Sequence, residues 1–135
     1  MKKQKGYTFI EILVVITIIA VLTAIGVVNF RVANKKSRDG KRKSDLEQIR
    51  AALELYRTDE GEYPANLSSL TGGSIIYMEK VPDDPLGDYD YSYASVVPNS
   101  TYVLCAALEL ETSGTCTGVS DCDTGTCNYE VNNPL

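Results

Sequence analysis

An uncharged run near the N-terminus constrains this chain more than any other feature. Residues 12–30 form 19 consecutive positions without a formally charged side chain, most of them Ile, Val, Leu, Ala or Phe. A helix needs about 20 apolar residues to cross the roughly 30 Å hydrocarbon core of a bilayer. The apolar positions surround the helix instead of forming one stripe, as lipid or a packed bundle requires. The run therefore predicts a membrane-spanning helix.

One carboxylate, Glu11, stands at the start of this run. An ionisable side chain within a membrane helix costs on the order of 2.5–3.5 kcal/mol on insertion scales, so it normally has a partner and a function. Cleavage after Gly6 would leave a cationic α-amine on Tyr7, one helical turn from Glu11. In an assembly of parallel helices, that amine would neutralise the Glu11 of a neighbour. The simpler alternative places Glu11 at the headgroup boundary.

A secretory signal peptide is the alternative interpretation of the N-terminus. Such a peptide has a basic start, a shorter apolar core and a small-residue cleavage site at the far end of that core. Here the run is longer, carries Glu11 at its start and continues without a break. The pattern favours a retained helix whose processing site lies on its N-terminal side.

The residues around Gly6 resemble the leader junction of a known family. Residues 6–11, with the sequence GYTFIE, are similar to the junction of type IV prepilins and type II secretion pseudopilins. The resemblance implies that a prepilin peptidase cuts after Gly6 and methylates the new N-terminus of Tyr7. It also implies that Glu11 sets the register of subunits in a helical filament. Tyr7 stands where phenylalanine is usual in the family.

Seven basic residues follow the apolar run: Arg31, Lys35, Lys36, Arg38, Lys41, Arg42 and Lys43. We expect a solvated helix face beside anionic headgroups. A DNA-contacting stripe is the alternative, but no aromatic residue is interleaved. Because these residues outnumber the three leader lysines, the positive-inside rule alone would place the C-terminus in the cytoplasm. The leader resemblance and the cysteines favour the opposite orientation, which we predict.

An apolar stripe marks a polar helix over residues 44–58. Its members are spaced 3, 4 and 3 residues apart: Leu46, Ile49, Leu53 and Tyr56. Residues 44–47 fit a capping box, so a separate helix could start at Ser44, with Gly40 as the break. Residues 45–64 resemble the major pseudopilin of type II secretion and related short pilins. That resemblance favours one continuous helix from Tyr7 to Asp59, stopped near Gly61.

Three short strands are predicted after this helix. Tyr89, Tyr91 and Tyr93 alternate with polar residues, residues 102–110 form a second strand after a turn at 98–100, and residues 128–131 form a third. We therefore expect an α+β, type IV pilin-like fold, in which one long N-terminal helix packs on a small antiparallel sheet with a disulfide-bearing C-terminal loop. The expected divisions are a leader (1–6), a transmembrane assembly helix (7–30), a polar half of the helix (31–60) and a globular head (61–135).

Four cysteines lie in the last third of the chain: Cys105, Cys116, Cys122 and Cys127. An even number in a segment exported behind a membrane helix predicts two disulfides. A zinc site is disfavoured because the gaps of 10, 5 and 4 residues contain no CxxC knuckle. Three pairings are possible and the sequence does not choose among them. We favour Cys105 with Cys127, strand to strand, and Cys116 with Cys122 within the loop.

A calcium site is a further hypothesis for the cysteine loop. Asp121 and Asp123 offer carboxylate oxygens at alternate positions, which suits calcium, but the other ligands of an EF-hand are missing. Some major pseudopilins bind calcium in a C-terminal loop, and the resemblance extends that hypothesis to these residues. If no calcium binds, the disulfides would hold the loop in this chain.

The charge balance excludes several functions. The formal net charge is −5 and becomes more negative once the leader lysines are removed, which argues against general nucleic-acid binding. The chain has no histidine, and no nucleophile motif or phosphate loop is recognisable, which argues against an enzyme. A membrane-tethered enzyme therefore remains only an alternative from another class.

The predicted function is a structural subunit of a type IV pilus-like or type II secretion pseudopilus filament. The resemblance implies several partners: identical subunits in a helical filament, a prepilin peptidase and methyltransferase, an inner-membrane assembly platform, and membrane lipid before assembly. The subunit would be a single-pass protein of the cytoplasmic membrane before it joins an extracytoplasmic filament. A minor pilin used for adhesion or DNA uptake is the alternative with the same fold.

Overall fold

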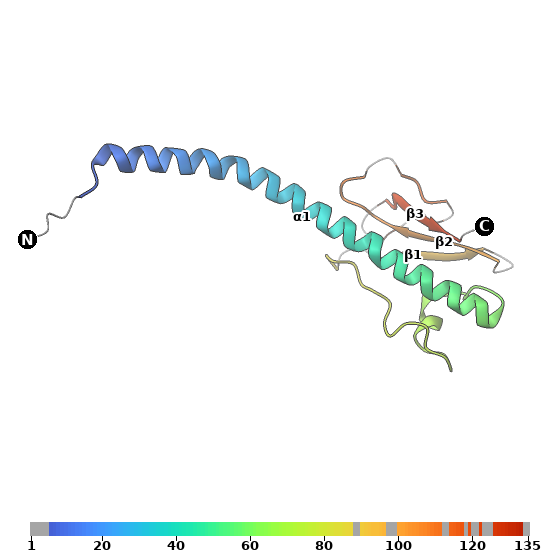
Figure 1. Ribbon diagram of the computed structural model, residues 1–135. Helices are drawn as coiled ribbons and strands as arrows, with labels where there is room; N and C mark the ends of the chain where they lie inside the picture. Colours follow the sequence, from blue (N-terminus) through green and yellow to red (C-terminus); the bar gives the residue numbers. More distant parts are fainter. Residues whose placement is uncertain are drawn as a thin grey trace, which may run out of the picture. The chain divides into compact units, whose positions relative to one another are not determined.

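The computed structural model describes residues 6–87, 90–96, 100–111, 114–117, 119, 122 and 126–133, with only the backbone at Val27 and Val28. In chain order the elements are the helix α1 (Phe9–Glu60), the short 3₁₀ helix η1 (Leu67–Leu70), and the strands β1 (Ser92–Val96), β2 (Thr101–Ala106) and β3 (Tyr129–Asn132) (Figure 1). The chain forms two compact units, and the boundary between them falls after Lys35.

The first unit holds the apolar half of α1. From Phe9 to Lys35 every side chain that the structure describes is exposed. By length and composition this part of the helix is able to cross a membrane. The apolar side chains described there are therefore not covered by the part of the chain that the structure describes.

The helix α1 runs through Gly40 without interruption, so the alternative of a separate helix starting at Ser44 is wrong. Gly40 is exposed, and a methyl group at its Cβ position would meet no atom of the described residues within 4 Å. The helix ends as expected near Gly61, which has a φ of +84° and donates its N–H to the carbonyl oxygen of Arg57 at 2.8 Å. This left-handed conformation suits glycine and stops the helix.

The apolar stripe on the second half of α1 forms one side of the head's core. Leu46, Ile49 and Leu53 are fully buried, and Tyr56 packs against them while remaining partly exposed. Figure 1 shows the three-stranded sheet lying alongside this half of the helix. The prediction that the stripe faces the sheet is confirmed. The stripe's partners from residues 61–135 are fully or almost fully buried: Tyr63, Leu70, Tyr102, Leu104, Ala106 and Val131.

The sheet is antiparallel with the order β1-β2-β3. In the central strand, Tyr102, Leu104 and Ala106 belong to the core shared with α1, while Cys105 belongs to a second buried cluster with the other cysteines. This alternation is the two-residue period of a strand. Tyr93 lies opposite Leu104 and donates its hydroxyl proton to the Pro64 carbonyl oxygen at 2.6 Å. Tyr89, the first residue of the predicted alternation, lies outside the described residues.

The central strand is shorter than predicted because β2 ends at Ala106, four residues before Leu110. The backbone N–H groups of Glu109 and Leu110 donate instead to the Asp39 carboxylate, at 2.9 and 3.0 Å. The backbone N–H of Leu108 donates to the Asn128 side-chain oxygen at 2.6 Å. Side chains thus replace the strand partners that these groups would need.

The four cysteines form two disulfides, Cys105–Cys116 and Cys122–Cys127. The prediction of two bridges is confirmed, but the favoured pairing of Cys105 with Cys127 and Cys116 with Cys122 is wrong. The register explains the error: Cys105 lies opposite Glu130 in β3, whereas Cys127 precedes that strand. Cys105 therefore bonds to the loop that follows its own strand.

Candidate functional site

The glycine junction lies outside α1. Gly6, Tyr7 and Thr8 have no regular secondary structure, and the helix begins at Phe9. The Tyr7 side chain is 85% exposed. Because the bond between Gly6 and Tyr7 precedes the helix, a peptidase can reach it without breaking intrahelical hydrogen bonds.

A capping box joins Thr8 and Glu11 at the start of α1. One carboxylate oxygen of Glu11 accepts the backbone N–H and the hydroxyl of Thr8, both at 2.7 Å. The backbone N–H of Glu11 points back to the Thr8 hydroxyl oxygen at 3.4 Å. This reciprocal arrangement satisfies donors that a helix N-terminus leaves free, and it places a negative charge near the positive end of the helix dipole.

Sequence reasoning missed this role of Thr8, although the signal was present. The spacing of a threonine and a glutamate three residues apart is the capping-box pattern, and the same pattern at Ser44 lies in the middle of α1. Both Thr8 and Glu11 follow the Gly6–Tyr7 bond, so removing the leader would leave the box intact. The role of Glu11 in subunit register stays a prediction.

Tyr7 and Glu11 share one surface groove at the start of the helix. The groove has a volume of about 580 Å³, and its other lining residues are apolar: Ile10, Ile12, Val14 and Val15. Because the lining is apolar, the Glu11 carboxylate of an isolated chain is solvated by water apart from its hydrogen bonds to Thr8. A bundle of such helices would replace that water, and Glu11 would then need a cationic partner.

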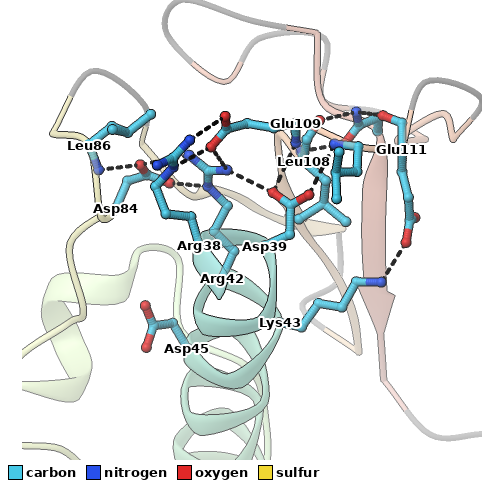
Figure 2. Close-up of polar contacts among 12 residues, drawn as sticks. Arg38, Asp39, Arg42, Lys43, Asp45, Asp84, Leu86, Leu108, Glu109 and Glu111 are labelled. Atoms are coloured by element: carbon cyan, nitrogen blue, oxygen red, sulfur yellow. Dashed lines mark hydrogen bonds and ion pairs between the residues drawn. The ribbon is translucent and has the colours of Figure 1, made fainter. Parts of the chain in front are cut away.

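A buried arginine organises the base of the head. Arg42 is fully buried, and its guanidinium donates to Asp84 through Nε at 2.6 Å and Nη2 at 3.0 Å. Its Nη1 donates to Asp39 at 2.9 Å and to Glu109 at 3.2 Å. Figure 2 shows the three carboxylates around this one side chain. Hydrogen bonding to Asp84 raises the pKa of Arg42 above its ordinary value, so the group is always cationic.

Neighbouring charges extend this cluster. Arg38 binds the Glu109 carboxylate through two nitrogens at 2.6 and 2.7 Å, a bidentate arrangement. Hydrogen bonds from Arg38 lower the pKa of Glu109. At a more exposed edge, Lys43 Nζ lies 2.5 Å from Glu111. The cluster fixes α1 to Asp84, in the segment before β1, and to Glu109, in the segment after β2 (Figure 2).

The prediction of a solvated basic face is therefore wrong for part of the stretch. Arg42 is buried, and Arg38 and Lys43 are partly buried in ion pairs with the head. The remaining four basic residues are exposed as predicted: Arg31, Lys35, Lys36 and Lys41. The acidic interruption at Asp39 was the available signal, because a carboxylate three residues before Arg42 on a helix can pair with it, as it does here.

The zinc and calcium hypotheses have different outcomes. Ligand atoms of Cys105, Cys116 and Glu130 lie within 4.8 Å of one another, but the two sulfur atoms are joined in a disulfide and are not thiolates. A zinc ion needs the thiolate form. Asp121 and Asp123, the calcium candidates, lie outside the described residues, so that hypothesis stays a prediction.

A capped apolar helix that continues into a small ion-paired head defines the class of pilin-like subunits. Two family models match the chain: the prokaryotic N-terminal methylation motif over residues 1–27, and type II secretion system protein G over residues 29–115. The chain belongs to the type II secretion system protein G family, the family of major pseudopilins.

Curated relatives agree with this assignment. The chain is 32% identical over 119 residues to the type II secretion system core protein G of Escherichia coli (strain K12), covering 78% of this chain and 81% of the relative. It is 32% identical to the protein of that name from Klebsiella pneumoniae, over 70% of this chain and 77% of the relative. The Vibrio cholerae protein is 30% identical over 70% and 73%. No solved structure matches the chain.

Proposed function

We propose that this chain, a structural pseudopilus subunit by family, is made as a precursor that a prepilin peptidase cuts after Gly6 and methylates on Tyr7. Residues 7–30 hold the precursor in the cytoplasmic membrane, and the head lies outside the cytoplasm. Identical subunits and an inner-membrane assembly platform are then its partners. The observation that carries the proposal is the exposed, non-helical junction followed directly by a capped apolar helix.

The junction also makes the proposal easy to test. A Cβ atom at Gly6 would meet nothing within 4 Å among the residues that the structure describes. A larger side chain there therefore disturbs no contact within the described part of the chain, and a block in processing would arise in the peptidase.

The test compares Gly6→Val with Gly26→Val in cells that make the secretion machinery. Gly26 is a matched control because its Cβ position also meets no atom within 4 Å in the described residues. Intact mass measurement of filament subunits should show a parent chain that begins at Tyr7 and carries one added methyl group. Gly6→Val should retain the full leader, and Gly26→Val should be processed. A Gly6→Val chain of mature mass would refute the cleavage assignment.

A further inference from the structure

A groove lies at the C-terminal end of α1, at the opposite end of the helix from Glu11. It has a volume of about 520 Å³. It is lined by Tyr56 and Glu60 of α1, by Ile75 and Tyr77, and by polar or small residues between Glu60 and Ile75. The rings of Tyr56 and Tyr77 form its aromatic wall, with centroids 5.2 Å apart. The groove thus combines aromatic surface with one carboxylate.

The charge around this groove is unbalanced. Asp59, Glu60 and Glu62 are exposed, and no ion pair joins them to a basic side chain among the described residues. The carbonyl groups at a helix C-terminus add partial negative charge at the same place. Arg57, the basic residue of the last turn, donates to the Tyr63 hydroxyl at 3.0 Å instead. The end of α1 therefore attracts cations.

Apolar side chains flank the acidic groups. Ile75 lines the groove and is 52% exposed, and its neighbour Ile76 is 67% exposed. Leu55, one helical turn before Asp59, is also exposed. Apolar surface beside unpaired charge is typical of a site for another protein.

One segment of the same sequence has the complementary pattern. In residues 30–36, Phe30 and Val32 expose apolar side chains, and Arg31, Lys35 and Lys36 are exposed without an ion pair in the part of the chain that the structure describes. Three of the four basic residues that follow, Arg38, Arg42 and Lys43, are by contrast already bound to carboxylates of the head. Residues 30–36 therefore keep charge and apolar area available for a partner.

The two patterns cannot meet within one chain. Lys35 and Glu60 belong to the same uninterrupted helix and are 25 residues apart. At 1.5 Å per residue, about 38 Å of helix separates them. Any contact between these surfaces must join two copies.

We propose that the groove at the C-terminal end of α1 receives residues 30–36 of a second copy in the filament. Arg31 and Lys35 of one copy pair with Asp59 and Glu60 of the other, and Val32, which lies on the same face of the helix as Lys35, covers Ile75 and Ile76. The two copies are staggered by about 38 Å along the helix direction, the distance from Lys35 to Glu60. The proposal rests on the proposed function, since it concerns subunits of one filament.

Cysteine cross-linking tests the apolar half of this contact. The variant with Val32→Cys and Ile75→Cys should give dimers and higher multimers on non-reducing gels of oxidised filaments. The matched control pairs Val32→Cys with Val96→Cys, because Val96 is similarly exposed at 48% but lies at the end of β1. Filaments that yield no ladder, or an equal ladder with the control pair, would overturn the proposal.

Charge reversal tests the electrostatic half. Changing Asp59 and Glu60 to Lys should reduce filament number about tenfold, because like charges then face each other. Changing Arg31 and Lys35 to Glu in the same chain should restore it. All four side chains are exposed, so the head should unfold at the parent's denaturant midpoint in each variant. Restoration no greater than with either change alone would count against the pairing.

Failure of this proposal is separable from failure of the proposed function. If the parent chain builds no filaments, the function itself is wrong. If parent filaments form but the Val32 and Ile75 cysteines do not cross-link, only the contact is wrong.

Discussion

The guanidinium of Arg42 and the carboxylate of Asp84 face each other through two hydrogen bonds of 2.6 and 3.0 Å, although 42 residues separate them in the chain. Their side chains are 0% and 1% exposed. Because the pair is bidentate and shielded from water, its geometry is fixed. It holds the segment before β1 against the helix at the base of the head.

Removing this arginine should destabilise the head severely. Arg42→Met keeps a long apolar side chain but strands Asp39, Asp84 and Glu109 without their shared cation. Removing one partner of a buried pair typically costs about 3–5 kcal/mol. Urea unfolding of the full chain in detergent, followed by tyrosine fluorescence, measures the loss.

The neighbouring lysine provides the control for that experiment. Lys41→Met changes an exposed residue one position away and should stay within about 0.5 kcal/mol of the parent. If Arg42→Met and Lys41→Met unfold at the same urea concentration, the buried cluster contributes nothing to stability.

Acid should weaken the head through Glu109. The hydrogen bonds from Arg38 lower the pKa of Glu109 below its ordinary value of 4.5. The Glu109 carboxylate therefore binds a proton less tightly in the folded state than in the unfolded chain. The stabilising effect is therefore complete above about pH 4.5 and is lost as the pH falls through the lowered folded-state pKa.

Urea midpoints measured between about pH 3 and pH 7 check this dependence. Glu109→Gln should be less stable than the parent near neutral pH, and the difference should shrink in acid. Glu109→Asp keeps the charge with a shorter side chain and should fall between them. A constant difference across the whole range would mean that Glu109 does not contribute through its charge.

Disulfide mapping should recover Cys105–Cys116 and Cys122–Cys127. Residues 81–135 contain no Lys or Arg, so trypsin does not separate the cysteines, whereas cleavage at Glu109, Glu111, Asp121 and Asp123 does. Each bridge should contribute roughly 2–4 kcal/mol. A mapped link between Cys105 and Cys127 would contradict the observed register of β2 and β3.

Glu11 should be needed for assembly but not for processing. In the isolated chain its carboxylate is bound by Thr8, and in a filament we expect it to pair with the Tyr7 amine of a neighbour. Glu11→Ala should leave cleavage and membrane insertion intact but sharply reduce filament growth, because each new subunit then buries an unpaired amine. Glu11→Asp should fall between. Filaments of normal number and length from Glu11→Ala subunits alone would show that the pairing is absent.

Thr8 separates helix capping from that pairing. Thr8→Val removes the hydroxyl and should weaken the helix start by about 1 kcal/mol, whereas Thr8→Ser should not. Amide hydrogen exchange in the first turn of α1 measures this directly. If both variants exchange like the parent, the capping box does not hold the helix start.

The features that follow from local sequence were predictable. The stripe of Leu46, Ile49 and Leu53 is set by helical periodicity, and all three residues are in the core. The stop at Gly61 is set by a residue that tolerates positive φ. Neither prediction needs information about distant residues.

One error concerns partners that are distant in sequence. Burial of Arg42 depends on Asp84 and Glu109, which are 42 and 67 residues away, and no local pattern reveals them. The disulfide pairing was missed for another reason: the observed bridges join cysteines 11 and 5 residues apart, but the spacing of the cysteines does not reveal the register that places Glu130 opposite Cys105.

The Asp39 contacts have a mechanical consequence. Tension on α1 reaches the backbone of Glu109 and Leu110 through the two hydrogen bonds to Asp39. That backbone belongs to the loop between Cys105 and Cys116, which is closed by a covalent bond. A pull along the helix is therefore delivered to a loop whose two ends are joined by a disulfide, so the loop cannot extend beyond that cross-link.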